Sequence, residues 1–250
     1  MKQASLRFYA ELNDFLPPER RMTDIPCPFH VGPSVRDLIE SLGVPHTEVD
    51  LILANGESVE FDYTVGDGDR ISVYPVFESL DIEPLARVRP EPLRHPRFVA
   101  DVHLGRLAAY LRMLGFDTFY RNDAPDEDLA RVSTGQQRIL LTRDRGLLKR
   151  SAVTRGYCLR QTLPREQLAE VLQRFELARL AAPFTRCLAC NGSLERVEKK
   201  AVADRLPPGV LTRYAEFLAC PACGRVYWKG THYQRMRLLV ERLLSAYGLF

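Results

Sequence analysis

Cys187-Leu188-Ala189-Cys190 and Cys220-Pro221-Ala222-Cys223 decide how the C-terminal part of this 250-residue chain folds. Two thiolates separated by two residues can turn back onto one metal ion, and two such pairs complete a tetrahedral shell of four sulfurs. Asn191-Gly192 follows the first pair and Gly224 the second, and these are residues that suit turns. We therefore expect a structural zinc site, with disulfides or unrelated thiols as the alternative. Because four protein ligands leave no open position on the metal, we look for the chemistry elsewhere.

The length and composition fit one to three globular domains and show no membrane segment. Hydrophobic residues make up 46% of the chain, but no apolar run approaches the ~20 residues of a membrane span. Residues 1–7 lack the apolar stretch of a signal peptide. We therefore expect a cytoplasmic protein, a compartment in which thiols stay reduced. The two isolated cysteines are Cys27 and Cys158, and the apolar context of Cys158 predicts burial.

The net charge of +3 conceals an uneven distribution along the chain. Residues 1–83 carry a net charge of −10, residues 84–160 carry +7 and residues 161–250 carry +6. An acidic first third followed by a basic remainder suggests separate domains with separate partners, and the basic part favours a polyanion. The alternative for the basic part is an ordinary solvated surface.

The first segment, residues 1–79, has the pattern of an α+β domain. Ser34 is a predicted N-cap and Gly43 a predicted C-cap of a helix with one apolar stripe. Strands are expected around it, at residues 5–10, 20–29, 50–53, 58–61 and 70–76. Strands of this order around a single helix predict a β-grasp fold.

This segment resembles the ubiquitin-like sulfur carriers of thiamine and molybdopterin synthesis. The matching stretches are Leu6-Arg7-Phe8-Tyr9-Ala10, Asn55-Gly56 and Gly68-Asp69-Arg70-Ile71-Ser72-Val73-Tyr74-Pro75. Those carriers end in a free Gly-Gly, whereas this chain continues through Val76-Phe77-Glu78. A role in interaction or regulation, with a protein partner, is therefore a better expectation than sulfur transfer.

A linker rich in proline and arginine is expected at residues 80–96, and an α/β domain at residues 97–180. Strands are predicted at residues 98–100, 116–120, 138–142 and 156–160, and helices at residues 104–114, 126–134, 146–150 and 164–174. Alternating strands and helices imply a parallel sheet with helices on both faces. Residues 181–250 then form a zinc ribbon with a C-terminal helix over residues 232–247.

Aspartates follow successive strands of the predicted parallel sheet, where functional groups gather. Asp101 follows the first strand, Asp123 and Asp126 follow the second, and Asp144 follows the third. Carboxylates brought close together repel one another unless a hard cation lies between them, so Asp101 and Asp144 predict a Mg²⁺ or Mn²⁺ site. The alternative for Asp101, Asp126 and Asp144 is that each only caps the helix that follows it.

Arginines accompany these acids and favour a phosphate-containing substrate. Arg143 and Arg145 flank Asp144, and Arg121 precedes Asp123. Guanidinium groups grip phosphate oxygens in a fork, so we expect these three side chains to bind substrate.

The second and third segments together resemble a PIN-type ribonuclease, in the branch named for the C-terminal domain of the Mut-seven exonuclease. The stretches that carry the resemblance are Phe98-Val99-Ala100-Asp101, Leu104-Gly105-Arg106-Leu107-Ala108, Leu111-Arg112-Met113-Leu114-Gly115-Phe116-Asp117, Arg138-Ile139-Leu140-Leu141-Thr142-Arg143-Asp144 and the two cysteine pairs with their flanks. The resemblance implies metal-dependent RNA hydrolysis, with Asp101, Asp126 and Asp144 at the acidic positions and Asp123 as a weaker match. Residues 157–161 offer no fourth acid, which favours one ion over two.

Aromatic and basic residues follow the second cysteine pair, in Trp228-Lys229-Gly230-Thr231-His232-Tyr233. Aromatic faces stack on unpaired bases and lysine contacts phosphate, so Trp228, Lys229, His232 and Tyr233 are expected to bind RNA. The alternative is that the aromatic rings pack on the ribbon or on the nuclease core, and that His232 only begins a helix.

Taken together, these patterns predict a ribonuclease with an aspartate-held Mg²⁺ or Mn²⁺ and a structural zinc. The second hypothesis is an RNA- or ribosome-binding adaptor without catalysis, which uses the ribbon and the basic surface. The sequence leaves open the RNA substrate, the direction of cleavage and the oligomeric state.

Overall fold

The computed structural model describes residues 1–75, 88 and 96–247 of the chain. The predicted linker at residues 80–96 lies outside the described residues, apart from Val88 and Pro96. The chain divides into two compact units. The first unit contains residues 1–95 and 126–158, the second contains residues 96–125 and 159–250, and each is described by itself.

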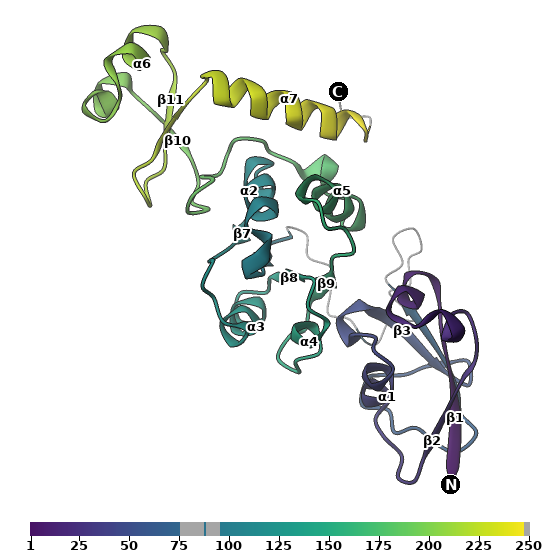
Figure 1. Ribbon diagram of the computed structural model, residues 1–250. Coiled ribbons are helices and arrows are strands. Elements are labelled where there is room, and N and C mark those ends of the chain that lie inside the picture. The colour runs from purple at the N-terminus through teal and green to yellow at the C-terminus, as the bar shows by residue number, and fades with distance from the viewer. Residues whose placement is uncertain (76–87, 89–95, 248–250) are drawn as a thin grey trace. The chain divides into compact units, whose positions relative to one another are not determined.

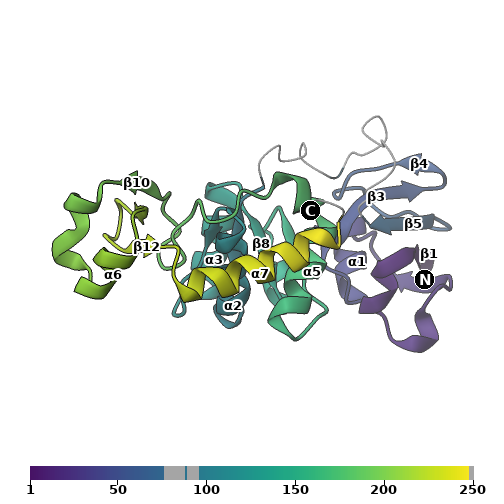
Figure 2. The ribbon, with the colours of Figure 1, turned by 90° about the horizontal axis from the view of Figure 1, so that it is seen from above.

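The N-terminal part of the first unit is a five-stranded mixed sheet with one helix. Its strands have the order β2-β1-β5-β3-β4, with β1 parallel to β5 and every other pair antiparallel. Figure 2 shows β4, β3, β5 and β1 side by side in this order. The elements are β1 (Lys2–Phe8), η1 (Ala10–Phe15), η2 (Pro18–Arg20), β2 (Ile25–Phe29), α1 (Val35–Ser41), η3 (His46–Glu48), β3 (Val49–Ala54), β4 (Glu57–Ser58) and β5 (Arg70–Pro75).

Alternation along the strands builds the core of this sheet. Leu6 and Phe8 of β1 are buried, as are Ile71 and Val73 of β5, because every second side chain faces the same side. Helix α1 begins as expected, since the Ser34 side chain accepts a hydrogen bond from the Asp37 backbone N–H at 3.1 Å. The strand predicted at residues 58–61 is shorter, because β4 ends at Ser58.

The remainder of the first unit consists of α3 (Asp126–Gly135), β8 (Ile139–Thr142), α4 (Arg145–Leu148) and β9 (Gly156–Cys158). Strands β8 and β9 are parallel, and all four residues of β8 are buried. A strand without exposed positions fits a sheet that is covered on both faces.

Side chains of the N-terminal domain bond directly to residues 145–158. Glu48 of η3 accepts the backbone N–H of Cys158 at 2.5 Å, and the Lys149 ammonium donates to the Glu40 carbonyl at 2.6 Å. His46 Nε2 lies 2.8 Å from the Val153 carbonyl oxygen. Through these bonds, the N-terminal sheet and the segment from α3 to β9 form parts of the same compact unit.

The second unit begins with β6 (Phe98–Ala100), η4 (Val102–Leu104), α2 (Gly105–Met113) and β7 (Thr118–Phe119), and continues with α5 (Pro164–Arg174) and η5 (Leu177–Leu180). Strands β6 and β7 are parallel, and Phe98 packs edge-on against Phe116 and Phe175. From β6 to α5, strands and helices alternate along the chain, as predicted (Figure 1).

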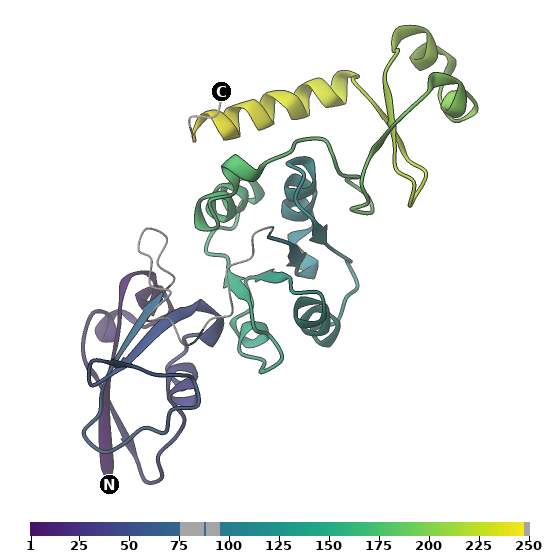
Figure 3. The same cartoon turned by 180° about the vertical axis from the view of Figure 1, so that it is seen from behind.

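The C-terminal part of the second unit is an antiparallel ribbon followed by a long helix. Its elements are β10 (Glu195–Val197), η6 (Lys199–Arg205), α6 (Pro208–Arg213), β11 (Phe217–Ala219), β12 (Val226–Trp228) and α7 (Thr231–Ser245). The helices η6 and α6 form an insert between β10 and β11 that the sequence analysis did not predict. In Figure 3 this insert and α7 leave the ribbon strands in different directions.

Among the described residues, no helix combines the length and the apolar character that crossing a membrane requires.

Candidate functional site

The four ribbon cysteines come together as predicted. The sulfur atoms of Cys187, Cys190, Cys220 and Cys223 all lie within 4.8 Å of one another. Both pairs fold into the same turn: the residue after each pair, Asn191 or Gly224, donates its N–H to the carbonyl of the first cysteine, at 2.9 and 2.8 Å. Both residues have positive φ, 70° and 74°, a conformation that asparagine and glycine tolerate best. Four convergent thiols form a group that can hold one metal ion.

The protonation of these thiols also fits a cation among them. Burial raises the pKa of Cys187, but hydrogen bonds from the Tyr227 hydroxyl and from the N–H groups of Cys190 and Ala189 bring it down to about 6. At Cys190 the Gly192 N–H lowers the pKa, whereas burial and the three neighbouring sulfurs raise it, to about 12. Because four thiolates this close repel one another, they can all ionise only when a metal ion replaces the protons.

The first cysteine turn is fixed to the α/β part of the second unit by a buried arginine. Arg112 of α2 donates from Nη1 to the carbonyls of Leu188 and Ala189, at 3.1 and 3.0 Å, and from Nε to Thr118 O at 2.9 Å. Arg112 is only 4% exposed. Burial lowers the pKa of its guanidinium group, whereas the nearby sulfurs of Cys187 and Cys190 raise it. The guanidinium therefore holds the two residues that lie between the ligands.

Asn191 and Asp117 make a second attachment. Asn191 accepts the Thr118 N–H through Oδ1 at 2.9 Å and donates from Nδ2 to Asp117 Oδ1 at 2.7 Å. Arg186 pairs with the other Asp117 oxygen at 3.8 Å. These roles of Arg112, Asn191 and Asp117 were not predicted, although an arginine on the apolar side of a predicted helix was an available signal for Arg112.

In the second unit, the candidate acids are Asp101 and Asp123. Asp101 follows β6 directly and is 7% exposed, and its carbonyl accepts the Leu104 N–H at 2.9 Å. Its side chain does not cap the η4 helix that follows. Asp123 is exposed and pairs with Arg121 at 3.1 Å, so these two predicted site residues neutralise each other.

In the first unit, the candidate acids are Asp126 and Asp144. Asp126 opens α3 and pairs with Arg150 at 3.6 Å, with both side chains partly exposed. Asp144 caps α4, because its Oδ1 accepts the N–H groups of Gly146 and Leu147 at 2.7 and 3.4 Å. Asp144 therefore does cap its helix, and the cap uses only one of its two carboxylate oxygens. The convergence of Asp101, Asp123, Asp126 and Asp144 on one metal ion stays a prediction.

The two arginines that flank Asp144 differ in their surroundings. Arg143 is exposed. Arg145 donates from Nη1 to the Phe15 carbonyl at 3.1 Å, and its guanidinium carbon lies 4.9 Å from the centre of the Phe15 ring. Arg145 thus contacts the N-terminal domain, a role that its position beside Asp144 did not indicate.

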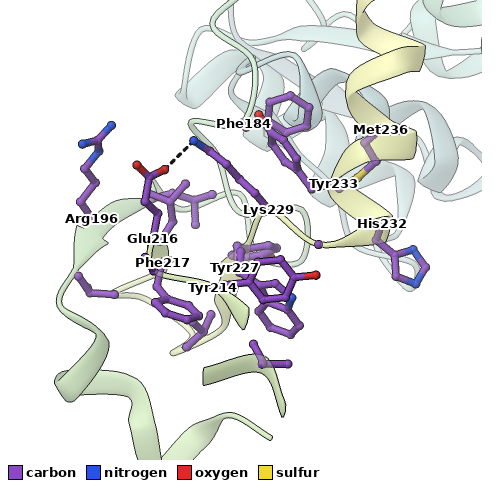
Figure 4. A pocket seen from close by; sticks show the side chains of 18 of the residues that line it. Phe184, Arg196, Tyr214, Glu216, Phe217, Tyr227, Lys229, His232, Tyr233 and Met236 are labelled. Carbon is purple, nitrogen blue, oxygen red and sulfur yellow. Dashed lines mark hydrogen bonds and ion pairs between the residues drawn. The ribbon is translucent and has the colours of Figure 1, made fainter. Parts of the chain in front are cut away.

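The predicted RNA-binding residues of the ribbon all line one cavity of about 1080 Å³ (Figure 4). Lys229 pairs with Glu216 at 2.6 Å, and the Tyr233 ring lies 4.7 Å from that of Phe184. Trp228 packs against the cluster of Val202, Leu206 and Phe217, as the packing alternative proposed, and still lines the cavity. His232 is exposed near the start of α7, and Figure 4 shows its ring pointing away from the aromatic group.

The described residues thus form a mixed N-terminal sheet, parallel strands followed by aspartates and a ribbon with four convergent cysteines. Residues 96–240 match the model of the family described as Mut7-C RNAse domain, and residues 1–81 match that described as Mut7-C ubiquitin. The chain belongs to the Mut7-C RNAse domain family, as the sequence resemblance predicted. Comparisons with curated proteins and with solved structures give no match.

Proposed function

We propose that this chain is a metal-dependent ribonuclease that hydrolyses RNA phosphodiester bonds. The observation that carries the proposal is the position of Asp101 directly after β6 and of Asp144 two residues after β8, in a domain of an RNase family. The proposal takes β6 and β8 as neighbours in one parallel sheet, so that the carboxyl ends of both strands, and the aspartates that follow them, share one edge. A PIN-like arrangement of the sheet is part of the proposal.

Asp101 and Asp144 would hold the ion, with Asp126 as the third acid and Asp123 in a minor role. Their hard oxygen donors suit Mg²⁺ or Mn²⁺. When bound, such an ion supplies an activated water and neutralises charge on the phosphate. Burial of Asp101 keeps its carboxylate partly shielded from water, where its attraction to a cation is stronger. Exposed Arg143 is suited to bind the phosphate.

The ribbon cysteines would hold zinc in a structural role. Two cysteine pairs with two intervening residues suit zinc, and the closed sulfur shell leaves no position for substrate. In the proposal, the zinc keeps the ribbon folded and the aspartates do the chemistry.

The substitution Asp144→Asn tests the proposal, because it separates the charge of this residue from its role as a helix cap. Asparagine caps a helix as well as aspartate does, so Asp144→Asn keeps the α4 cap while it removes the charge. We expect unchanged thermal stability and at least a hundredfold loss of Mn²⁺-dependent cleavage of single-stranded RNA, since charge at the metal is required. Asp101→Asn should cause a similar loss of cleavage.

Glu127→Gln is the matched control, because Glu127 is an exposed acid of α3 outside the proposed metal site. We expect it to change the cleavage rate less than threefold. Equal cleavage by the wild type and Asp144→Asn would refute the ribonuclease proposal and favour an RNA-binding adaptor instead.

A further inference from the structure

The ribbon cavity combines aromatic rings with a helical insert that the two cysteine pairs do not require. It lies among the ribbon strands, α6 and the start of α7, and all of its lining belongs to the second unit. Six of its lining residues carry aromatic rings: Phe184, Tyr214, Phe217, Tyr227, Trp228 and Tyr233. Phe217 is buried, and the other five are only partly buried. A cavity of this composition offers flat apolar faces to a ligand.

The rings are held in place by their own packing. Trp228 and Tyr214 pack against the insert cluster of Val202, Leu206 and Phe217. The Gly230 Cα approaches the Trp228 indole so closely that an added Cβ would come within 2.8 Å of Nε1. A ring that is fixed before binding loses little conformational entropy when a ligand stacks on it.

Positive charge surrounds these rings. The charged lining residues are Arg186, Arg196, Arg213, Lys229 and Glu216, a net charge of +3. Glu216 is already paired with Lys229, and Arg186 with Asp117 outside the cavity. Arg196 and Arg213 are exposed, so an anionic ligand can reach both guanidinium groups. Flat apolar faces beside cationic groups complement a base with its attached phosphates.

We propose that this cavity binds a single-stranded segment of RNA, with an unpaired base against Trp228 and phosphates at Arg196 and Arg213. This inference rests on the proposed function and gives it a substrate class. A base within a duplex already stacks on its neighbours, so it cannot present its face to the cavity. The ribbon would therefore select RNA with unpaired nucleotides.

The chain contains a single tryptophan, Trp228, so its fluorescence reports on the cavity alone. We would titrate the full-length Asp144→Asn variant with a ten-nucleotide uridine RNA, a blunt RNA duplex and an abasic ribose-phosphate strand of the same length. Stacking predicts strong quenching by the uridine RNA, and at least tenfold weaker binding of the other two, since neither of them offers an unpaired base.

Charge-matched variants test the phosphate contacts. We expect Arg196→Ala with Arg213→Ala to weaken uridine RNA binding at least tenfold. Lys199→Ala with Lys200→Ala removes the same charge from η6, outside the cavity lining, and should weaken it less than threefold. Tyr214→Ala should weaken binding while it leaves the tryptophan in place. Metal content and thermal midpoint, measured for every variant, identify any that fails to fold.

Several results would overturn the inference: no quenching by the uridine RNA, equal binding of the duplex or the abasic strand, or equal losses from the two double variants. Quenching by an acidic peptide in place of RNA would also overturn it and assign the cavity to a protein. Because cleavage is not measured, quenching together with an inactive wild-type enzyme would leave this inference intact and refute only the ribonuclease.

Discussion

His46 Nε2 lies 2.8 Å from the carbonyl oxygen of Val153, which joins two segments of the first unit that are far apart in the sequence. The other ring nitrogen lies 2.6 Å from a carboxylate oxygen of Glu40, and Arg36 and the edge of Phe61 complete the surroundings. The ring is 6% exposed. The junction between the N-terminal domain and residues 145–158 is therefore built around a buried, titratable group.

The first prediction is that this junction weakens in mild acid. Burial and the Arg36 charge lower the pKa of His46 below its ordinary value of 6.5, against the raising effects of Val153 O and Glu40. A lowered pKa means that the neutral ring stabilises the fold above pH 6.5 and that this stabilisation is lost as the pH falls below it. The thermal midpoint should therefore drop between pH 7.5 and 5.5. His46→Gln should flatten this dependence, whereas exposed His30→Gln should leave it unchanged. A wild-type slope in the His46 variant would contradict the prediction.

The second prediction separates the two arginines beside Asp144. Arg145→Ala removes the hydrogen bond to Phe15 O and the contact with its ring, so it should lower the free energy of unfolding by about 1 kcal/mol. Exposed Arg143→Ala should change it by less than about 0.5 kcal/mol. Urea unfolding of the two variants checks this contrast. The same loss from both would show that Arg145 contributes nothing specific.

The third prediction concerns the arginine that holds the first cysteine turn. Arg112→Met leaves one buried and two partly buried carbonyl groups without their donor, at a cost of about 2 kcal/mol. Because the turn carries two of the four sulfurs, we also expect roughly tenfold weaker metal binding in a competition with a chelating indicator. Arg106→Met, at an exposed position of the same helix, is the control and should change neither quantity.

The fourth prediction is that the cysteines react in two classes. Removal of the metal with a strong chelator should expose the sulfurs of Cys187, Cys190, Cys220 and Cys223 to a thiol reagent, and should lower the thermal midpoint because metal binding contributes to folding. Buried Cys27 and Cys158 should stay protected in the native protein. Release of one zinc per chain is expected, and rapid reaction of all six thiols before chelation would exclude a bound metal.

Sequence patterns predicted those structural features that depend on a few neighbouring residues. The cysteine spacing predicted the sulfur cluster, Ser34 predicted the start of α1, and the pattern at residues 138–142 predicted the strand observed as β8. Each of these depends on residue types within a few positions of one another. Such signals survive in any tertiary context.

The insert and the junction were beyond these patterns for different reasons. Helices η6 and α6 are too short to show a clear helical repeat of apolar residues, and from this insert only Val202 and Leu206 are buried against the ribbon. Pro208 at the start of α6 was nevertheless a usable signal for the beginning of a helix. At the junction, the acceptor of the His46 bond is a backbone carbonyl, which every residue has. No residue type marks such a contact in the sequence.

The sequence boundary between the two family matches does not coincide with a boundary between independently unfolding parts of the protein. The amide of Cys158 lies in the segment that matches the RNAse family, yet its acceptor is a carboxylate oxygen of Glu48 in the ubiquitin-like segment. In hydrogen exchange this amide would follow the opening of η3 and β3. In a shortened chain that begins at Pro96, hydrogen-bond donors on β9 and α4 would lack their acceptors. A loss of activity in that chain would therefore reflect the loss of structural support for these elements and not the loss of a binding partner.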